Sequence, residues 1–406
     1  MIVVFRPGTA PGAAGRDLAA RTGAQLVHVY ASVFPGAALL PPAGVNHDAF
    51  AADPRVRFVA PDRLLRTFQQ QLPTGIDRVE ADRNPTAAIS QKRNGVNVHL
   101  AILDTGLDRG HPDLNIAGGY NATTMRRDDW QDRDGHGTHV AGTAAAIDNG
   151  FGVVGVAPGA PVWGVKVCKG LICLLSDIIA GIDWTIEQKR NGRVDFAAIN
   201  MSLGGGGSSD DNCGLTQGDP FHTAVCAAVD AGIVVVVAAG NESADATNVT
   251  PAAYPESFTV SAIADFNGKA GGGAAPTCRS DEDDTFANFS NFGPPVDIAA
   301  PGVCILSTYV RGGYATLSGT SMATPHVTGA VALYLAANRR PPARDRRGVE
   351  SIRKAIVDAG IPQTHDCGFA GDPDGLPEPL LFVNAKAFKG DGTCEMADST
   401  TRTLNR

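Results

Sequence analysis

The chain has 406 residues, of which 43% are hydrophobic and 19% charged, a composition typical of a folded globular protein and unlike that of a disordered or fibrous one. The formal net charge is −8 and no long basic stretch occurs, which argues against a nucleic-acid partner. No apolar run is long enough to cross a bilayer, so we expect no membrane partner either.

Residues 1–68 show a pattern of their own, in which short apolar strands alternate with short helices. We predict strands at Ile2–Phe5, Gln25–Tyr30, Phe34–Leu40 and Val56–Val59, and helices at Gly15–Thr22 and Asn46–Ala52. This is a small α+β domain, and a unit of this size is expected to be marginally stable alone. A polar, glutamine-rich joint follows it.

Residues 69–384 form a second domain in which strand-like and helical apolar runs alternate. We predict strands at Val96–Leu103, Ala160–Val167, Phe196–Met201, Ile233–Ala238 and Phe258–Ile263, and helices at Thr138–Ala146, Leu175–Glu187 and Phe221–Ala231. The near-continuous Val, Ile and Ala in these strands predict an α/β fold, with a parallel sheet flanked by helices on both faces. Residues 385–406 are predicted to form a C-terminal tail.

The eight cysteines contain no Cys-x-x-Cys pair, so disulfides in an oxidising compartment are favoured over a zinc ribbon. Eight cysteines allow 105 pairings, and we expect neighbours in the sequence to pair. The expected bridges are Cys168–Cys173, Cys213–Cys226, Cys278–Cys304 and Cys367–Cys394. The start of the chain lacks the pattern of a secretory signal, so the protein is either cytosolic or has had its signal removed. The expected disulfides favour the second, and we expect a secreted monomer.

The stretch Gly319–His326 opens an apolar run that continues to Leu335 and has no polar face, which predicts a buried helix. Since Pro325 is tolerated only near a helix start, the helix should begin near Ser321. Ser321 would then lie at the positive end of the helix, where developing negative charge is stabilised. For a single Ser in this position, a helix cap is the ordinary role.

Polar residues follow the other predicted strands and precede the predicted helices. Asp104 ends one strand, His136 begins a helix, Ser202 ends a second strand and Asn241 follows a third. In an open parallel sheet these strand ends gather at one edge, where ligands bind. Asp, His and Ser are the groups that orient a base, remove a proton and attack a carbonyl, while an Asn amide can stabilise the resulting oxyanion. Each residue taken singly has a plainer explanation as a turn or cap residue.

Four stretches together carry a family resemblance. They are Ala101–Gly106 (AILDTG), Gly135–Thr143 (GHGTHVAGT), Ala239–Asn241 (AGN) and Gly319–His326 (GTSMATPH). In these the chain resembles the subtilisin-like serine proteases (subtilases). The resemblance implies that Asp104 orients His136, that His136 acts as base and acid, that Ser321 attacks and that Asn241 donates in the oxyanion hole. It implies a serine endopeptidase that acts on polypeptide substrates.

The resemblance also implies a substrate site. Ser202, Leu203 and Gly204 match the segment along which such enzymes bind an extended peptide, and Ala238, Ala239 and Gly240 match the opposite wall of the pocket for the residue before the cut. Both walls are small and uncharged, so we expect broad specificity with a preference for a large apolar or aromatic residue there. We see no carboxylate cluster that would select a basic residue, although distant loops could supply one.

By the same resemblance, residues 1–68 correspond to an inhibitory propeptide that assists folding and is removed autocatalytically, so the chain is expected to be its own intramolecular partner. Alignment of the joint places the cut between Phe68 and Gln69, which puts Phe68 in the predicted apolar pocket.

A structural Ca²⁺ site is the next implication, because residues 147–153 match the calcium loop of the family. Carried over by position, the ligands are the Gln70 and Asn149 amide oxygens, the Asp113 carboxylate and the main-chain carbonyls of Ile147, Phe151 and Val153. An ordinary Asn-Gly turn is the alternative. We expect Gln70 to reach this loop only after the chain is cut nearby. A second acidic stretch, Asp281–Asp284, is expected to be a solvated loop.

Two other classes of protein remain as alternatives. One is a catalytically silent subtilase relative that acts as a binding protein. The other is an esterase with an α/β-hydrolase fold, which would place its Ser in Gly-x-Ser-x-Gly and its His last in the chain. In this sequence Ser321 is followed by Met322 and Ala323, and His136 precedes it.

Overall fold

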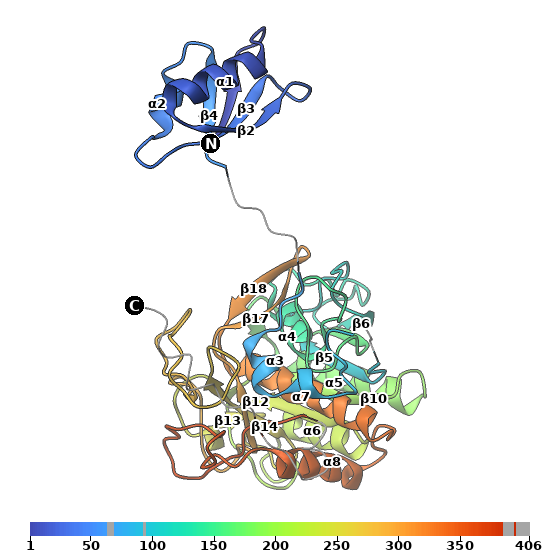
Figure 1. Ribbon diagram of the computed structural model, residues 1–406. Helices are drawn as coiled ribbons and strands as arrows, with labels where there is room; N and C mark the ends of the chain where they lie inside the picture. Colours follow the sequence, from blue (N-terminus) through green and yellow to red (C-terminus); the bar gives the residue numbers. More distant parts are fainter. Residues whose placement is uncertain (63–68, 92–94, 385–393, 395–406) are drawn as a thin grey trace. The chain divides into compact units, whose positions relative to one another are not determined.

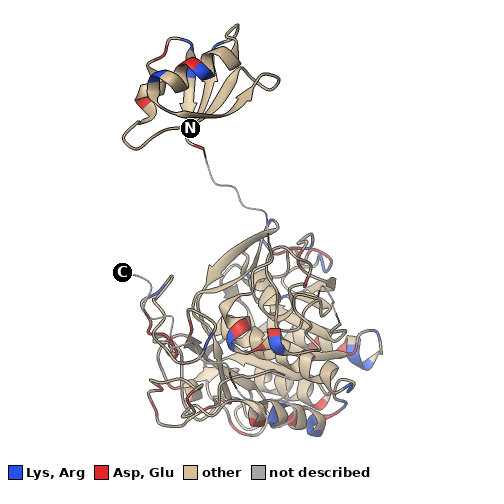
Figure 2. Ribbon diagram, viewed as in Figure 1, with Lys and Arg blue, Asp and Glu red and all other residues tan. Residues whose placement is uncertain are grey.

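The computed structural model describes residues 1–62, 69–91, 95–384 and Cys394 (Figure 1). The chain divides into two compact units, Met1–Thr67 and Phe68–Arg406, so the boundary lies one residue before the predicted one. Among the helices in the described ranges, none has the length and apolar character needed to cross a membrane. Lys and Arg are interspersed with Asp and Glu on the second unit, most visibly on helix α8 (Arg346–Ala359) (Figure 2).

The first unit is an antiparallel sheet in the order β2-β3-β1-β4, packed against two helices. Its elements are β1 (Ile2–Phe5), α1 (Pro11–Thr22), β2 (Gln25–Tyr30), β3 (Gly36–Leu40), α2 (His47–Ala51) and β4 (Val56–Ala60). All six were predicted in type and approximate position. Its core is small, since only ten buried apolar residues form it.

The second unit is built on an eight-stranded sheet in the order β15-β14-β12-β10-β5-β7-β6, with β16 paired to β14. The strands are β5 (His99–Asp104), β6 (Ile116–Asn121), β7 (Val162–Lys166), β10 (Phe196–Met201), β12 (Val234–Ala238), β14 (Phe258–Ala264), β15 (Thr285–Phe286) and β16 (Ile298–Pro301). All neighbours are parallel except β14 and β15. The predicted parallel sheet is confirmed, and its inner strands are buried on both faces.

Helices cover both faces of this sheet (Figure 1). The helix α4 (His136–Ala145) packs against α7 (Thr320–Ala337), and α5 (Leu175–Arg190) packs against α6 (Pro220–Asp230). The helix α7 crosses β10, β12 and β14 and is buried over most of its length. This layering places the carboxyl ends of β5, β10 and β12 beside the amino ends of α4 and α7.

Several smaller elements were not predicted from the sequence. They are α3 (Thr74–Arg78), the hairpin of β8 (Cys168–Lys169) and β9 (Ile172–Cys173), the pair β11 (Gly205–Gly206) and β13 (Val249–Thr250), the hairpin of β17 (Ile305–Tyr309) and β18 (Gly313–Leu317), and α8. The strand β6 was missed because it carries Gly118 and Gly119, where a Cβ would collide with the Trp163 and Trp130 rings. Its glycines serve packing rather than strand propensity.

All four expected disulfides are present: Cys168–Cys173, Cys213–Cys226, Cys278–Cys304 and Cys367–Cys394. In the chain-entropy model, closing these loops stabilises the fold by about 2 kcal/mol for the shortest and about 3.5 kcal/mol for the longest. The last bridge ties Cys394 to the body of the second unit, while the rest of the predicted tail lies outside the described residues.

Candidate active site

Ser321 is the second residue of α7, so it lies at the positive end of a buried helix, as predicted. Its backbone N–H has no acceptor among the described residues and is free to donate. Pro325, four residues further on, cannot donate to the Ser321 carbonyl, which instead accepts a hydrogen bond from Ser202 Oγ at 2.9 Å. This contact ties the end of β10 to the start of α7.

Asp104 and His136 form the second part of the site. His136 Nδ1 lies 2.8 Å from Asp104 Oδ1 and 2.9 Å from Oδ2, and the Asp104 side chain is buried. Gly135, which precedes His136, has φ 115°, a conformation that favours glycine. Burial lowers the pKa of His136, but the charge and hydrogen bond of Asp104 outweigh it and raise that pKa above its usual 6.5.

A buried network that sequence analysis missed braces this pair. Thr105 Oγ1 accepts from Gly137 N at 2.9 Å and donates to Asp132 Oδ1 at 2.9 Å. Asp132 also accepts from the N–H and the hydroxyl of Thr138. The network joins the end of β5 to the first turn of α4, so it fixes the distance between Asp104 and His136. The motifs contain Thr105 and Thr138, but only the fold shows that they meet Asp132.

Ser321 and His136 line one cleft of about 420 Å³, the triad cleft, together with Asp104, Ser202 and Asn241. The Ser321 hydroxyl donates to the Ser202 carbonyl at 3.2 Å and not to His136. In the absence of substrate such contacts are often loose, and a rotation about the Cα–Cβ bond of Ser321 redirects the hydroxyl.

Asn241 is held with its amide nitrogen free. Its Oδ1 accepts from Thr320 N at 2.8 Å and interacts with Thr320 Oγ1 at 3.0 Å. Because the oxygen is occupied, the NH₂ group is the part left to donate into the cleft, beside the free N–H of Ser321. Gly240, with φ 114°, gives the turn that follows β12. Thr320 is a supporting residue that the sequence analysis did not identify.

A second cleft of about 410 Å³, the main cleft, adjoins Ser321. Leu203, Gly204, Ala238 and Gly240 line it as expected. Ala239 does not line it, because its side chain is buried and faces the interior.

The main cleft has acidic residues in addition to the small, uncharged walls that were expected. Glu242 and Asp245 also line the main cleft. The Glu242 carboxylate accepts from Asn241 N and from Asn291 Nδ2, while Asp245 accepts from Thr247. The sequence places both residues just beyond the AGN motif, and only the turn after β12 brings them to the pocket wall.

The residues of the expected calcium loop lie together. The carbonyls of Ile147 and Val153 both point at Gln70 Nε2, at 2.7 and 2.9 Å. Asn149 Nδ2 donates to Asp113 Oδ1 at 2.8 Å, and burial raises the pKa of Asp113. Two carbonyls that converge on one point, and a buried carboxylate that bonds to Val153 N in the same loop, are the oxygen groups that a hard cation prefers. These residues therefore fit the predicted metal.

Two expectations about neighbouring segments were wrong. Gln70 already contacts the loop in the uncut chain, since its own N–H also bonds to Gly150, so cleavage is not required for it to reach the site. The acidic stretch is not a solvated loop: Asp281, Asp283 and Asp284 are each less than 8% exposed. Asp284 pairs with the buried Arg78, which supplies the counter-charge that the sequence pattern did not reveal.

Comparison with known proteins agrees with this geometry. Residues 95–371 match the model of the "Subtilase family", which is more than half of the chain. The chain belongs to the subtilase family. The matched region contains Asp104, His136, Asn241 and Ser321.

Bacterial subtilisins are among the relatives of this subtilase. Subtilisin NAT of Bacillus subtilis subsp. natto is 40% identical over 287 residues, which are 70% of this chain and 66% of the relative. The subtilisin of Bacillus pumilus is 40% identical over 66% of this chain and 85% of its own length. A crystal structure of a cold-adapted subtilisin-like serine proteinase matches with a TM-score of 0.58 and 31% identity, over 76% of this chain and 97% of that one. The chain thus spans just under two thirds of the length of the first relatives.

Proposed function

We propose that this subtilase is a secreted serine endopeptidase that hydrolyses peptide bonds with Asp104, His136 and Ser321. The observation that carries this proposal is the buried Asp104 carboxylate that holds Nδ1 of His136 in the same cleft as Ser321. With Nδ1 carrying the proton, Nε2 is left as the basic atom. Relatives that bear the name subtilisin, at about 40% identity, support the same activity.

In the first half of the reaction, the Ser321 hydroxyl leaves the Ser202 carbonyl, gives its proton to His136 Nε2 and attacks the substrate carbonyl carbon. The carbonyl oxygen becomes an oxyanion, which accepts hydrogen bonds from Ser321 N–H and Asn241 Nδ2. His136 then protonates the leaving amine, and an acyl-enzyme forms. Water attacks it in the second half, with His136 first as base and then as acid.

The substrate is proposed to be an extended polypeptide that lies along Ser202–Gly204, with the side chain before the cut in the main cleft. Glycine, alanine, leucine and valine make up more than half of the lining of that cleft, which favours a large apolar or aromatic side chain. Glu242 and Asp245 add acceptors at its edge, so a Lys or Arg side chain should be accepted as well. Broad specificity follows from backbone pairing, which any sequence provides.

The first unit is proposed to be an inhibitory propeptide. It leaves Val27, Val29, Val33, Leu40 and Phe58 each at least 43% exposed, which is a large apolar surface for so small a unit. Such a surface is expected of a unit that folds against a partner, and its own small core gives little stability. The proposed cut follows Phe68, which lies outside the described residues, and Gln69 is exposed.

A structural Ca²⁺ is proposed at the loop, held by Gln70, Asp113, Asn149 and the carbonyls of Ile147, Phe151 and Val153. When bound, the ion supplies no reaction chemistry; it links the N-terminal end of the second unit to the loop after α4. The Gln70 side chain would then point its amide oxygen, rather than its nitrogen, toward the place where the Ile147 and Val153 carbonyls converge.

The test is active-site labelling of the mature protein with a fluorophosphonate, followed by peptide mapping and a fluorogenic peptide assay. We expect label on Ser321, turnover of the peptide, and loss of both in Ser321→Ala. A folded protein that takes up no label and cleaves no peptide would identify a silent binding relative instead. Turnover of an ester substrate without turnover of the matched peptide would identify an esterase.

A further inference from the structure

A third cleft, the side cleft, shares the segment Leu203–Gly206 with the main cleft and has a volume of about 600 Å³. Its walls are largely apolar and come from the β8–β9 hairpin, α5, the start of α6 and the turn before β14. The lining includes Leu171, Leu175, Ile178, Phe221, Tyr254 and Asp219. Because it adjoins the proposed substrate segment, a side chain of the same bound peptide can reach it.

Of the described residues that line the side cleft, Asp219 is the charged one. Its Oδ1 accepts from Phe221 N at 2.9 Å as the N-cap of α6, and its Oδ2 accepts from the Tyr254 hydroxyl at 2.5 Å. An ionised carboxylate offers about four acceptor positions, so about two remain for a ligand. The start of α6 carries roughly half a positive charge, which offsets only part of the carboxylate's charge.

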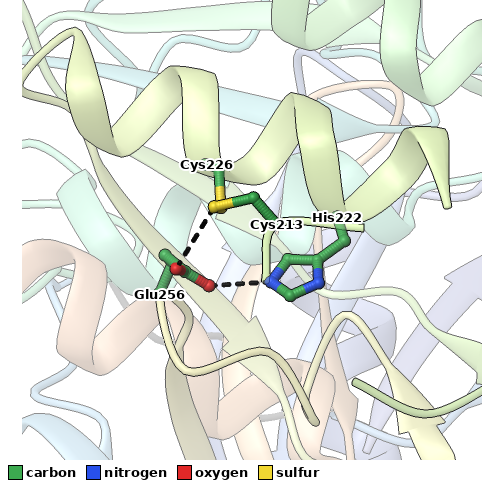
Figure 3. Close-up of side chains that lie close together, drawn as sticks. All are labelled: Cys213, His222, Cys226 and Glu256. Atoms are coloured by element: carbon green, nitrogen blue, oxygen red, sulfur yellow. Dashed lines mark hydrogen bonds and ion pairs between the residues drawn. A yellow bond between two sulfur atoms is a disulfide. The ribbon is translucent and has the colours of Figure 1, made fainter. Parts of the chain in front are cut away.

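A group of four side chains, of which His222 and Cys226 are buried, lies behind the wall of the side cleft that Tyr254 and α6 form (Figure 3). His222 Nε2 lies 2.8 Å from Glu256 Oε2, and the Cys213–Cys226 disulfide lies beside them. The His222 ring stacks on the ring of Tyr254, with centroids 4.1 Å apart and planes 2° apart.

These four residues, Cys213, His222, Cys226 and Glu256, lie close enough together to resemble a metal site, but the sulfurs are joined to each other and Arg346 pairs with the Glu256 carboxylate. The group therefore has a structural role rather than a metal-binding one. It fixes Tyr254 on the turn before β14 and α6 beside it, and so positions Asp219 in the side cleft.

We propose that Asp219 makes the side cleft select a basic side chain of the substrate, an Arg or Lys that lies upstream of the residue in the main cleft. The aliphatic stem of that side chain would pack on Leu175 and Ile178, and its cationic head would pair with Asp219 near the Phe221 and Tyr254 rings. A neutral apolar side chain would fit the same walls but would cover the carboxylate without pairing it. The proposal rests on the proposed peptidase activity and adds a specificity determinant to it.

The test uses fluorogenic peptides with Phe before the cut, Ala elsewhere, and a single Arg moved through the upstream positions. Each peptide has a partner in which citrulline, a neutral isostere, replaces the Arg. At one position we expect kcat/KM for the Arg peptide to exceed that for the citrulline peptide by about 10-fold, the size of a charge-assisted hydrogen bond. The advantage should shrink as salt is added.

The matched variant is Asp219→Asn, which removes the charge and keeps one oxygen to cap α6, while its NH₂ group replaces Oδ2 and can donate to the Tyr254 hydroxyl oxygen. Its ratio of kcat/KM for the Arg peptide to that for the citrulline peptide should fall to about one. Tyr254→Phe, which keeps the charge, should retain that advantage. An Arg-to-citrulline ratio near one at every position in the wild type, or an unchanged ratio in Asp219→Asn, would overturn the proposal. If the wild type cleaves none of the peptides, the result counts against the proposed peptidase activity itself.

Discussion

The substitution Asp104→Asn tests the proposed mechanism most directly, because the surroundings of Asp104 determine how an Asn would sit. Asp104 Oδ1 accepts from Thr105 N at 2.7 Å, so the Asn oxygen is expected to keep that position. The Asn NH₂ group would then replace Oδ2, 2.9 Å from His136 Nδ1, and would compete for that nitrogen with the retained oxygen, which lies 2.8 Å away and already accepts from Thr105 N. A donor in that place binds the tautomer with its proton on Nε2, which cannot accept the proton of Ser321.

Two effects follow, and they differ in kind. A wrong tautomer costs about 10⁴-fold in kcat, which is ~5.4 kcal/mol of transition-state stabilisation. The pH profile should shift as well. In the wild type Asp104 raises the pKa of His136 above 6.5, and activity requires the neutral form, so kcat/KM is lost as the pH falls through that raised value. Without the charge, burial is left to lower the pKa, and the acid limb should move to lower pH.

The assay is kcat/KM on one fluorogenic peptide across the pH range, for the wild type and for the variant after removal of the first unit. Asp134→Asn is the matched control, because Asp134 also raises the pKa of His136 but touches only its backbone N–H. The control should shift the acid limb slightly and keep nearly all of the rate. A fall smaller than about 100-fold in Asp104→Asn, or an acid limb that stays in place, would refute the assigned role.

Three further predictions concern stability. Arg78→Met should lower the free energy of unfolding of the second unit by about 3–5 kcal/mol in urea denaturation, because Asp265 and Asp284 lose their buried partner. Burial already raises the pKa of both carboxyl groups, so the loss should be greater at pH 8 than at pH 5. An equal loss at both pH values would contradict this. A calcium chelator should lower the melting temperature of the mature wild type but leave that of Asp113→Asn unchanged. If the chelator lowers both melting temperatures equally, the loop is not the metal site. Glu378→Gln should stabilise the fold above pH 7 and not at pH 4. Burial raises the pKa of Glu378 from its ordinary 4.5 to about 7, so the stability of the wild type falls as the pH rises from 4.5 through 7. Identical plots of stability against pH for the wild type and the variant would disprove this role of Glu378.

Much of the fold could be predicted because it rests on local patterns. The strand Phe196–Met201 and the helix that begins at Leu175 were placed from apolar periodicity alone, which reports burial directly. The elements that were missed depend on partners far away in the chain. The glycines of β6 make sense only against the Trp163 and Trp130 rings. The amphipathic helix α8 buries Val349, Ile352 and Ile356 among many charges.

The sequence by itself identified the candidate residues of the site, because Asp104, His136, Asn241 and Ser321 each lie in a short motif at a strand end or helix start. The tertiary structure alone decided how those groups are oriented and what lies around them. Thr320 turns the Asn241 amide, and Asp219 reaches the side cleft from a loop after β11. Charge and hydrogen bonding act through space over a few ångströms, and the sequence does not record which distant residues come that close.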